Sequence, residues 1–140
     1  MAPSVALISS AVISAEGLLD FIVQNGGVPM GPDYGRVSQE DRHIWIYLSS
    51  NEIASMLGDA EDEKEGYVDR LVALLDGKPQ SMVTVQLSKS QGSGAIALEF
   101  ANRFAERWPS IVQDADEQLL SPANLCEVAR GQRTARPFSH

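Results

Sequence analysis

The stretch from Asp59 to Glu65 holds the largest group of acidic side chains in the chain. Its acids are Asp59, Glu61, Asp62, Glu63 and Glu65, with one base among them, in a chain of formal net charge −8. Carboxylates at this density attract a basic protein surface and repel the phosphates of nucleic acids. The charge therefore argues against direct binding of DNA or RNA and favours a basic protein partner, although solubility alone also accounts for it.

A second acidic group consists of Asp114, Asp116 and Glu117, and its composition is typical of a polar turn. Neither group has the alternating oxygen ligands and central glycine of a calcium-binding EF-hand loop. General acid–base catalysis needs two carboxyl groups in different environments, whereas acids in a solvated run share one. We therefore expect no metal, no cofactor and no enzymatic activity, and we interpret both groups as candidates for contact with a protein partner.

The segment Gly92-Ser93-Gly94 opens a G-x-G-x-x-A sequence after a predicted strand. Such a segment can receive a phosphate at a helix N-terminus, with Asp114 placed where a ribose-binding acid is sought. Residues 88–91 separate the strand from the first glycine, and 26 residues follow Asp114, too few for a second nucleotide-binding half. The other interpretation is a flexible loop in which Ser93 caps the helix. Binding of a small ligand or nucleotide is the alternative function.

Residues 43–48 alternate between aromatic and aliphatic side chains, the period of a strand. One face carries Ile44, Ile46 and Leu48, and the other carries His43, Trp45 and Tyr47. The aliphatic face belongs in the core. The aromatic face is either buried under the last helix or the tail, or it is a binding surface with Trp45 and Tyr47 as anchors. A small enzyme would need His43 beside a second polar residue.

Length and composition indicate one globular domain, since the chain has 140 residues, 44% of them hydrophobic and 21% charged. Cys126 is the only cysteine and is typical of a small core residue, so no internal disulfide forms and a reducing compartment fits. The apolar start lacks the basic region of a signal peptide, and no segment approaches the roughly 18 apolar residues of a membrane helix. We expect a cytoplasmic protein.

The pattern of helices and strands that must position these residues indicates a single α+β domain over residues 1–131. Residues 132–140 are predicted to form a mobile basic tail. Their order, β-α-β-β-α-β-α-β with a short C-terminal helix, predicts a mixed sheet of four to five strands with three main helices packed on it. The first six elements have the order of a ferredoxin-like split β-α-β fold. Strands are predicted at 4–13, 36–38, 43–48, 82–87 and 110–113, and helices after Ser14, over 61–76, over 94–108 and after Ser121. Residues 28–35, with two prolines and two glycines, are predicted to be a loop.

Two segments, 42–48 (RHIWIYL) and 98–114 (LEFANRFAERWPSIVQD), resemble those of immunity proteins from bacterial polymorphic-toxin systems. The resemblance implies a cytoplasmic inhibitor of a toxin delivered by contact-dependent or type VI secretion, which covers the toxin's active or substrate-binding surface. It transfers no functional residue. For a basic toxin, the acids named above are the electrostatic candidates, with Trp45 and Tyr47 as anchors. Whether the chain forms a homo-oligomer stays open.

Overall fold

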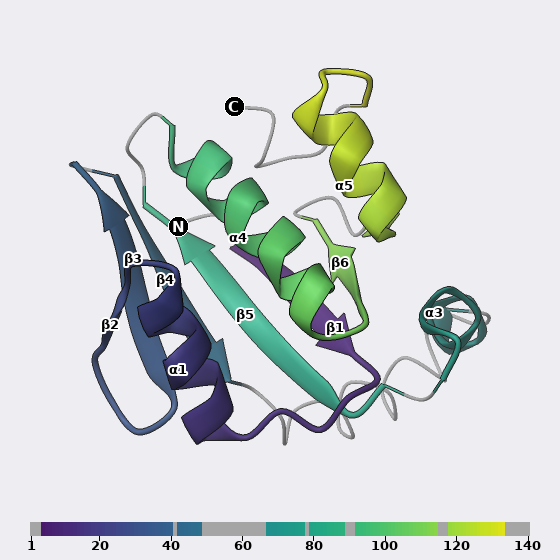
Figure 1. Ribbon diagram of the computed structural model, residues 1–140. Coiled ribbons are helices and arrows are strands. Elements are labelled where there is room, and N and C mark those ends of the chain that lie inside the picture. Colours follow the sequence, from purple (N-terminus) through teal and green to yellow (C-terminus); the bar gives the residue numbers. More distant parts are fainter. Residues whose placement is uncertain are drawn as a thin grey trace.

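The computed structural model describes residues 4–40, 42–48, 67–77, 79–88, 92–114 and 118–133, which form one sheet and four helices (Figure 1). The strands are β1 (Ser4–Ser9), β2 (Val28–Pro29), β3 (Tyr34–Gln39), β4 (Arg42–Leu48), β5 (Ser81–Leu87), β6 (Ser110–Gln113) and β7 (Leu119–Leu120). The helices are α1 (Ala15–Gln24), α3 (Tyr67–Leu75), α4 (Ser93–Arg107) and α5 (Pro122–Ala129). The α+β class is confirmed.

The sheet has seven strands within the described residues, in the order β2-β3-β4-β5-β1-β6-β7. Every neighbouring pair is antiparallel, so the predicted mixed sheet of four to five strands is wrong in strand count and in pairing. The additional strands, β2 and β7, have two residues each, too few for an alternating pattern to reveal them. Pro29 fits into β2 because β2 is an edge strand, where a missing N–H interrupts no ladder.

The connections do not follow the ferredoxin-like arrangement that the order of elements predicts. That arrangement places one strand between β1 and the strand after α1, but β3, β4 and β5 all lie between β1 and β2, the strand that follows α1. The strands on either side of α3, β4 and β5, are direct antiparallel neighbours. A split β-α-β unit forms later in the chain instead, where α4 joins β5 to β6 and β1 lies between these two parallel strands.

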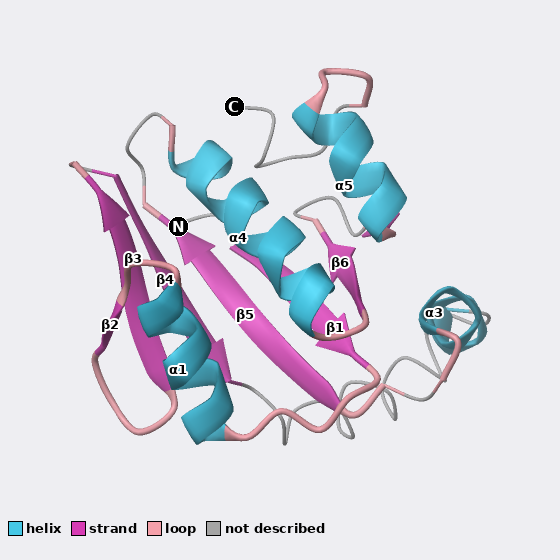
Figure 2. Ribbon diagram, viewed as in Figure 1, coloured by secondary structure: helices cyan, strands magenta, loops and turns pink. Residues whose placement is uncertain are grey.

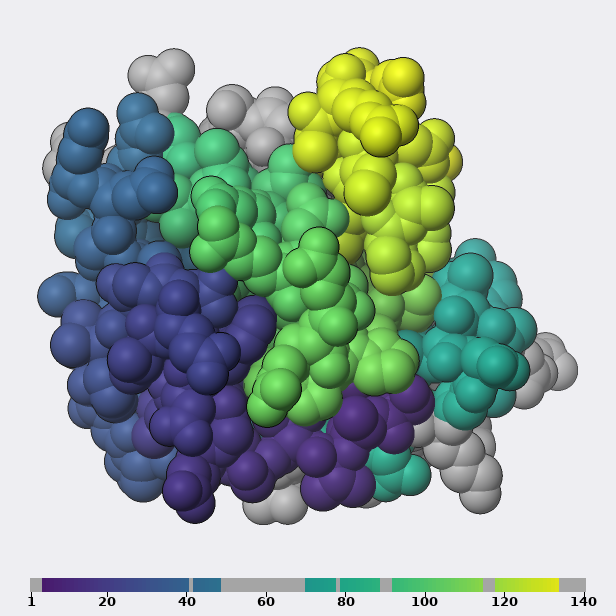
Figure 3. All heavy atoms as spheres, in the orientation of Figure 1, coloured from purple at the N-terminus to yellow at the C-terminus, as the bar shows by residue number. Residues whose placement is uncertain are grey.

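Two apolar cores lie on opposite faces of the sheet, because successive side chains of a strand point to opposite sides. The larger core joins Leu7 and Val83 to side chains of α1, α4 and α5. The smaller core joins their sequence neighbours, Ile8 and Met82, to Leu71 of α3. Figure 2 shows α1, α4 and α5 in front of the sheet. In the space-filling view of Figure 3, these three helices and the strands beside them form a continuous surface.

Aromatic rings of α1 and of the end of α4 pack against one another in the larger core. The ring centroid of Phe21 lies 5.3 Å from that of Phe100 and 5.2 Å from that of Trp108, in edge-on contacts. Phe104 has no exposed surface and lies 5.0 Å from Trp108. Such pairs add about 0.5–1.5 kcal/mol each to the free energy of area burial. The apolar side of this helix therefore forms the contact between α4, α1 and the sheet.

The predicted starts of α1 and α5 agree with the structure. Ser14 accepts a hydrogen bond from the backbone N–H of Gly17 at 3.0 Å, and Ser121 accepts one from Asn124 at 3.2 Å, so both serines are N-caps. The predicted helix start at Glu61 and the tail from residue 134 lie outside the described residues. The predicted loop over 28–35 is wrong at both ends, since β2 and the start of β3 occupy them.

Candidate functional site

The outer face of the β3–β4 hairpin is the first candidate site. Side chains of β4 alternate as predicted, with Ile44 and Ile46 fully buried in the larger core and Trp45 and Tyr47 half-buried on the opposite face. The register pairs Tyr34 with Tyr47, Arg36 with Trp45, and Ser38 with His43. We call these six residues the aromatic face. It lies on the side of the sheet opposite to α1, α4 and α5.

Contacts between neighbours order the aromatic face. Tyr34 and Tyr47 stack, with ring centroids 5.3 Å apart and ring planes at 16°. A hydrogen bond of 2.8 Å joins Oγ of Ser38 to Nδ1 of His43, whose ring centroid lies 6.1 Å from that of Trp45. Ser38 is thus the polar neighbour that a catalytic His43 would require, but the pair is also an ordinary cross-strand contact. The sequence prediction misses Tyr34, because it places this residue in the loop over 28–35 and not in β3.

The last helix does not cover the aromatic face. Through Leu125 and Val128, α5 packs into the larger core beside α4, on the other side of the sheet (Figure 1). The helix on the same side as the aromatic face is α3, but it packs over β1, β5 and β6, where Leu71 joins Ile8 and Ile111. The prediction that the last helix buries the aromatic face is therefore wrong. Burial under the tail is not tested, because the tail lies mostly outside the described residues. The alternative, a binding surface, stays a prediction.

Arg36 adds a cation and an unsatisfied donor to the aromatic face. Its Nε is buried and has no hydrogen-bond partner among the described residues. A buried donor without an acceptor costs about 1–3 kcal/mol, and more when the group is charged. The aromatic face therefore combines ring surfaces with the cation of Arg36, whose Nε is itself buried.

The second candidate, Gly92-Ser93-Gly94, begins α4. Gly92 is the N-cap residue, with φ of 94°, a left-handed conformation that favours glycine. The guanidinium of Arg42 packs against it so closely that its Nε would lie 2.7 Å from a Cβ at this position. Ser93 is the first helical residue, only 2% exposed, with its Oγ 2.5 Å from that of Ser88. The prediction that Ser93 caps the helix is therefore wrong.

The strands around this segment do not match a dinucleotide-binding unit. In such a unit, the strand before the glycines and the strand after the helix belong to a parallel sheet, whereas β1 separates β5 from β6 here and is antiparallel to both. Asp114, the predicted ribose-binding acid, is 5% exposed. Its carboxylate accepts hydrogen bonds from the backbone N–H of Gln118 at 2.7 Å and from its side-chain amide at 3.2 Å. It thereby links the residue after β6 to the residue before β7.

Most of the acids predicted to contact a partner lie outside the described residues. They are Asp59, Glu61, Asp62, Glu63, Glu65, Asp116 and Glu117. Asp114 is described, and its carboxylate accepts hydrogen bonds from Gln118. Its contact with a partner stays a prediction, as do those of the other acids.

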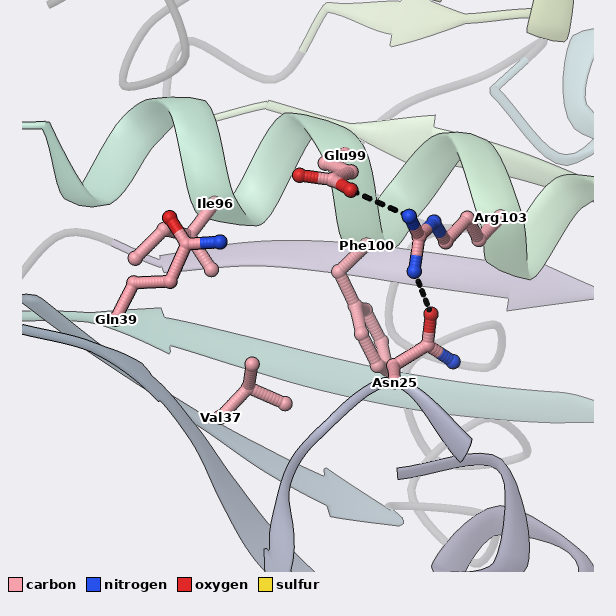
Figure 4. Close-up of a pocket in the computed structure, with 7 residues that line it drawn as sticks. All are labelled: Asn25, Val37, Gln39, Ile96, Glu99, Phe100 and Arg103. Atoms are coloured by element: carbon pink, nitrogen blue, oxygen red, sulfur yellow. Dashed lines mark hydrogen bonds and ion pairs between the residues drawn. The ribbon is translucent and has the colours of Figure 1, made fainter. Parts of the chain in front are cut away.

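A cavity of about 160 Å³ lies between the end of α1, β3 and the middle of α4 (Figure 4). Its floor is apolar and consists of Val37, Ile96 and Phe100. Its rim is polar and consists of Asn25, Gln39, Glu99 and Arg103. No sequence pattern predicts this site, because its residues come from three separate segments that only the fold brings together.

The guanidinium of Arg103 is held from two sides at this rim. Its Nη2 lies 2.6 Å from Oε1 of Glu99, four residues earlier in α4, and its Nη1 donates to Oδ1 of Asn25 at 2.9 Å. The amide of Asn25 in turn donates to the backbone oxygen of Phe21 at 2.8 Å. The side chains of Glu99 and Arg103 are about half exposed, so the ion pair adds only about 0–1 kcal/mol to stability. Its effect is to fix the position of both charges.

The C-terminal helix carries two further side chains with chemical character. Cys126 is exposed, contrary to the core position expected for it, because Leu125 and Val128 take the buried side of α5. A hydrogen bond from Nδ2 of Asn124 at 2.8 Å lowers the pKa of the Glu127 carboxyl below its ordinary value, and the nearby Arg133 lowers it further. Neither residue has a chemical partner that suggests catalysis.

Across the part of the chain that the structure describes, no three His, Cys, Asp or Glu side chains gather closely enough to hold a metal ion. No helix within those same ranges combines the length and the apolar character needed to cross a membrane.

Comparison of the chain with models of protein families, with curated proteins and with solved structures finds no match.

Proposed function

We propose that this chain is an immunity protein, which binds a cognate toxin in the cytoplasm and occludes the toxin's active or substrate-binding surface without catalysing a reaction. The observation that carries the proposal is the aromatic face, where Tyr34, Trp45 and Tyr47 lie half-buried on the side of the sheet that α1, α4 and α5 leave uncovered. The other features of the proposal rest on charge and on the resemblance of the two segments described above.

The ring types and their order suit a binding surface. Tryptophan, tyrosine and arginine are the residues most enriched where a few side chains dominate the free energy of binding. Tyr34 and Tyr47 stack on each other across the hairpin, so each ring loses little conformational entropy when a partner binds. A partner that contributes an apolar or cationic surface would complement these rings.

The net charge of −8 favours a basic partner. Many lysine and arginine side chains on a nuclease-like toxin would be attracted over long range, which can raise association rates to about 10⁸–10⁹ M⁻¹s⁻¹ at low salt. At contact, such cations are stabilised by about 0.5–2 kcal/mol over the faces of tryptophan and tyrosine rings. The acidic run over 59–65 contributes to the attraction, and the aromatic face contributes to the lifetime of the complex.

The size of the aromatic face sets a limit on its role. A standard interface covers about 800 Å² of each partner, about a tenth of the 7698 Å² surface of this chain. Two strands of six residues span about 10 by 20 Å, or about 200 Å². The aromatic face therefore supplies about a quarter of such an interface. It acts as the anchor, and flanking segments provide the remaining contact.

Cell survival tests the proposal. The gene immediately upstream is expressed alone, with this chain, and with the variants Tyr47→Ala and Val23→Ala. We expect the neighbour to be toxic alone, and wild-type chain and Val23→Ala to restore growth, because Val23 is an exposed side chain on α1 outside the aromatic face. Tyr47→Ala is expected to protect less well. A neighbour that is harmless alone removes the basis of the immunity function.

A small-ligand site at Gly92-Ser93-Gly94 is the second candidate, because Arg42 places a guanidinium beside the N-terminus of α4. Calorimetric titration with AMP separates the two functions. Binding by the wild type that is lost in Arg42→Gln supports the ligand site. If the wild type does not bind AMP, the ligand site is contradicted, and the proposed binding of a toxin is not affected.

A further inference from the structure

We propose that the cavity between α1, β3 and α4 binds a small zwitterion of the α-amino-acid class. This activity is separate from the proposed binding of a toxin, since the cavity lies on the helix-covered side of the sheet and the aromatic face lies on the other. The argument rests on the size of the cavity, on the two charges at its rim and on how those charges are held.

The size of the cavity limits the ligand. A cavity of about 150 Å³ accommodates a molecule as large as benzene, whereas drug-sized ligands occupy about 300–1,000 Å³. At about 160 Å³, this cavity is too small for a nucleotide. The side chain of valine or leucine fits it, with the polar head of the amino acid in the open mouth.

The charges at the rim select the ligand's head group. Glu99 and Arg103 bring one negative and one positive charge to the same mouth, 2.6 Å apart. A simple anion would lie beside the carboxylate of Glu99, and a simple cation beside the guanidinium of Arg103. A zwitterion places an opposite charge against each, so its complementarity is greater than that of either single ion.

The arrangement in Figure 4 indicates how the ligand lies. The second carboxylate oxygen of Glu99 points away from Arg103 toward the side of Gln39, where it can accept from the ligand's ammonium group. The bonds of Arg103 to Glu99 and Asn25 use two of the five N–H donors of a guanidinium, and others can donate to the ligand's carboxylate. The ligand's side chain then lies over Val37, Ile96 and Phe100, each of which is at most 6% exposed.

The rim charges are positioned before any ligand binds. Asn25 fixes Arg103 and is itself fixed by the backbone oxygen of Phe21, at the end of α1. Glu99 and Arg103 are one helical turn apart on α4, and aromatic packing holds α4 against α1. A ligand therefore spends little of its binding energy on ordering these side chains.

Calorimetric titration of the full chain with L-leucine tests the proposal. We expect a dissociation constant of about 1 mM or tighter, as suits a ligand of this size. Two analogues lack one charge each: 3-methylbutan-1-amine has no carboxylate, and 4-methylpentanoate has no ammonium group. Each is expected to bind at least about tenfold more weakly, because one charged hydrogen-bonding group is lost. No binding of leucine up to about 10 mM, or equal binding of either analogue, overturns the proposal.

Variants of one helix provide matched controls. Glu99→Gln keeps the shape of the rim and removes its negative charge, so we expect leucine to bind at least about tenfold more weakly. Glu106→Gln makes the same change at an exposed position of α4 outside the cavity and is expected to bind as the wild type does. NMR signals of the Asn25 and Gln39 side-chain amides should shift on titration. Equal binding by Glu99→Gln and wild type, or unmoved amide signals, contradicts the assignment.

Discussion

Replacing Phe104 by alanine should lower the free energy of unfolding by about 3–5 kcal/mol. The ring has no exposed surface, and its centroid lies 5.0 Å from that of Trp108 and 6.1 Å from that of Phe21. The sheet and α1 hold the surrounding side chains, so they can fill the resulting space only in part. Domains are stable by about 5–15 kcal/mol, and each kcal/mol corresponds to about 4 °C at this chain length. The midpoint of thermal unfolding should therefore fall by about 12–20 °C.

Urea unfolding followed by tryptophan fluorescence measures this loss, because Trp108 packs directly on the altered site. Glu106→Ala, on the exposed side of the same helix, should change the free energy of unfolding by less than about 0.5 kcal/mol. Phe104→Leu, which keeps most of the apolar volume, should lose less than Phe104→Ala. A loss below about 1 kcal/mol for Phe104→Ala would mean that this ring is not packed between α4, α1 and the sheet as described.

Three further outcomes follow from the same structure. The pKa of Glu127 is lowered, so its contacts stabilise the fold at pH values above the ordinary glutamate pKa of about 4.3, and this contribution is lost as the pH falls through the lowered pKa. The difference in urea midpoint between wild type and Glu127→Gln should therefore shrink on acidification. A difference that stays constant with pH contradicts this expectation. Gly92→Ala should cost about 1–3 kcal/mol in thermal unfolding, because its φ is 94° and Arg42 must move, and it should cost more than Gly131→Ala, where φ is 74° and nothing lies within 4 Å. Changing all five acids of the run over 59–65 to amides should slow association with the purified toxin about tenfold or more at low salt and flatten its salt dependence, and an unchanged rate removes the run from the mechanism.

The sequence predicts elements whose hydrophobic period and end signals are clear. The long helix α4, the alternation of β4, and the helices after Ser14 and Ser121 all form as expected, because each depends on neighbouring residues alone. Strands of two residues escape prediction, since β2 and β7 form only because a longer strand offers an edge to pair with. The order of strands escapes it for a related reason, as the choice of neighbour for β1 depends on contacts far apart in the chain.

The same contrast between local pattern and long-range contact separates the site residues that the sequence predicts from those that it does not. Trp45 and Tyr47 were predicted to share a face, and local alternation was sufficient to show it. Their partner Tyr34 was not predicted, because prolines and glycines around it hide the start of β3. The cavity could not be predicted at all, since Asn25 and Arg103 meet only when α1 and α4 pack together. The burial of Asp114 was likewise hidden, because it depends on contact with Gln118, the residue before a strand of two residues.

The dissociation constant of the complex with the toxin from the upstream gene tests the central claim most directly. It is measured for wild type, Trp45→Ala and Val23→Ala, with circular dichroism to confirm that each variant is folded. If the aromatic face is the anchor, Trp45→Ala raises the dissociation constant by about 30-fold or more, the effect of losing an interface residue worth about 2 kcal/mol. Val23→Ala then binds as the wild type does. Equal dissociation constants for wild type and Trp45→Ala would contradict the claim that this face binds the toxin.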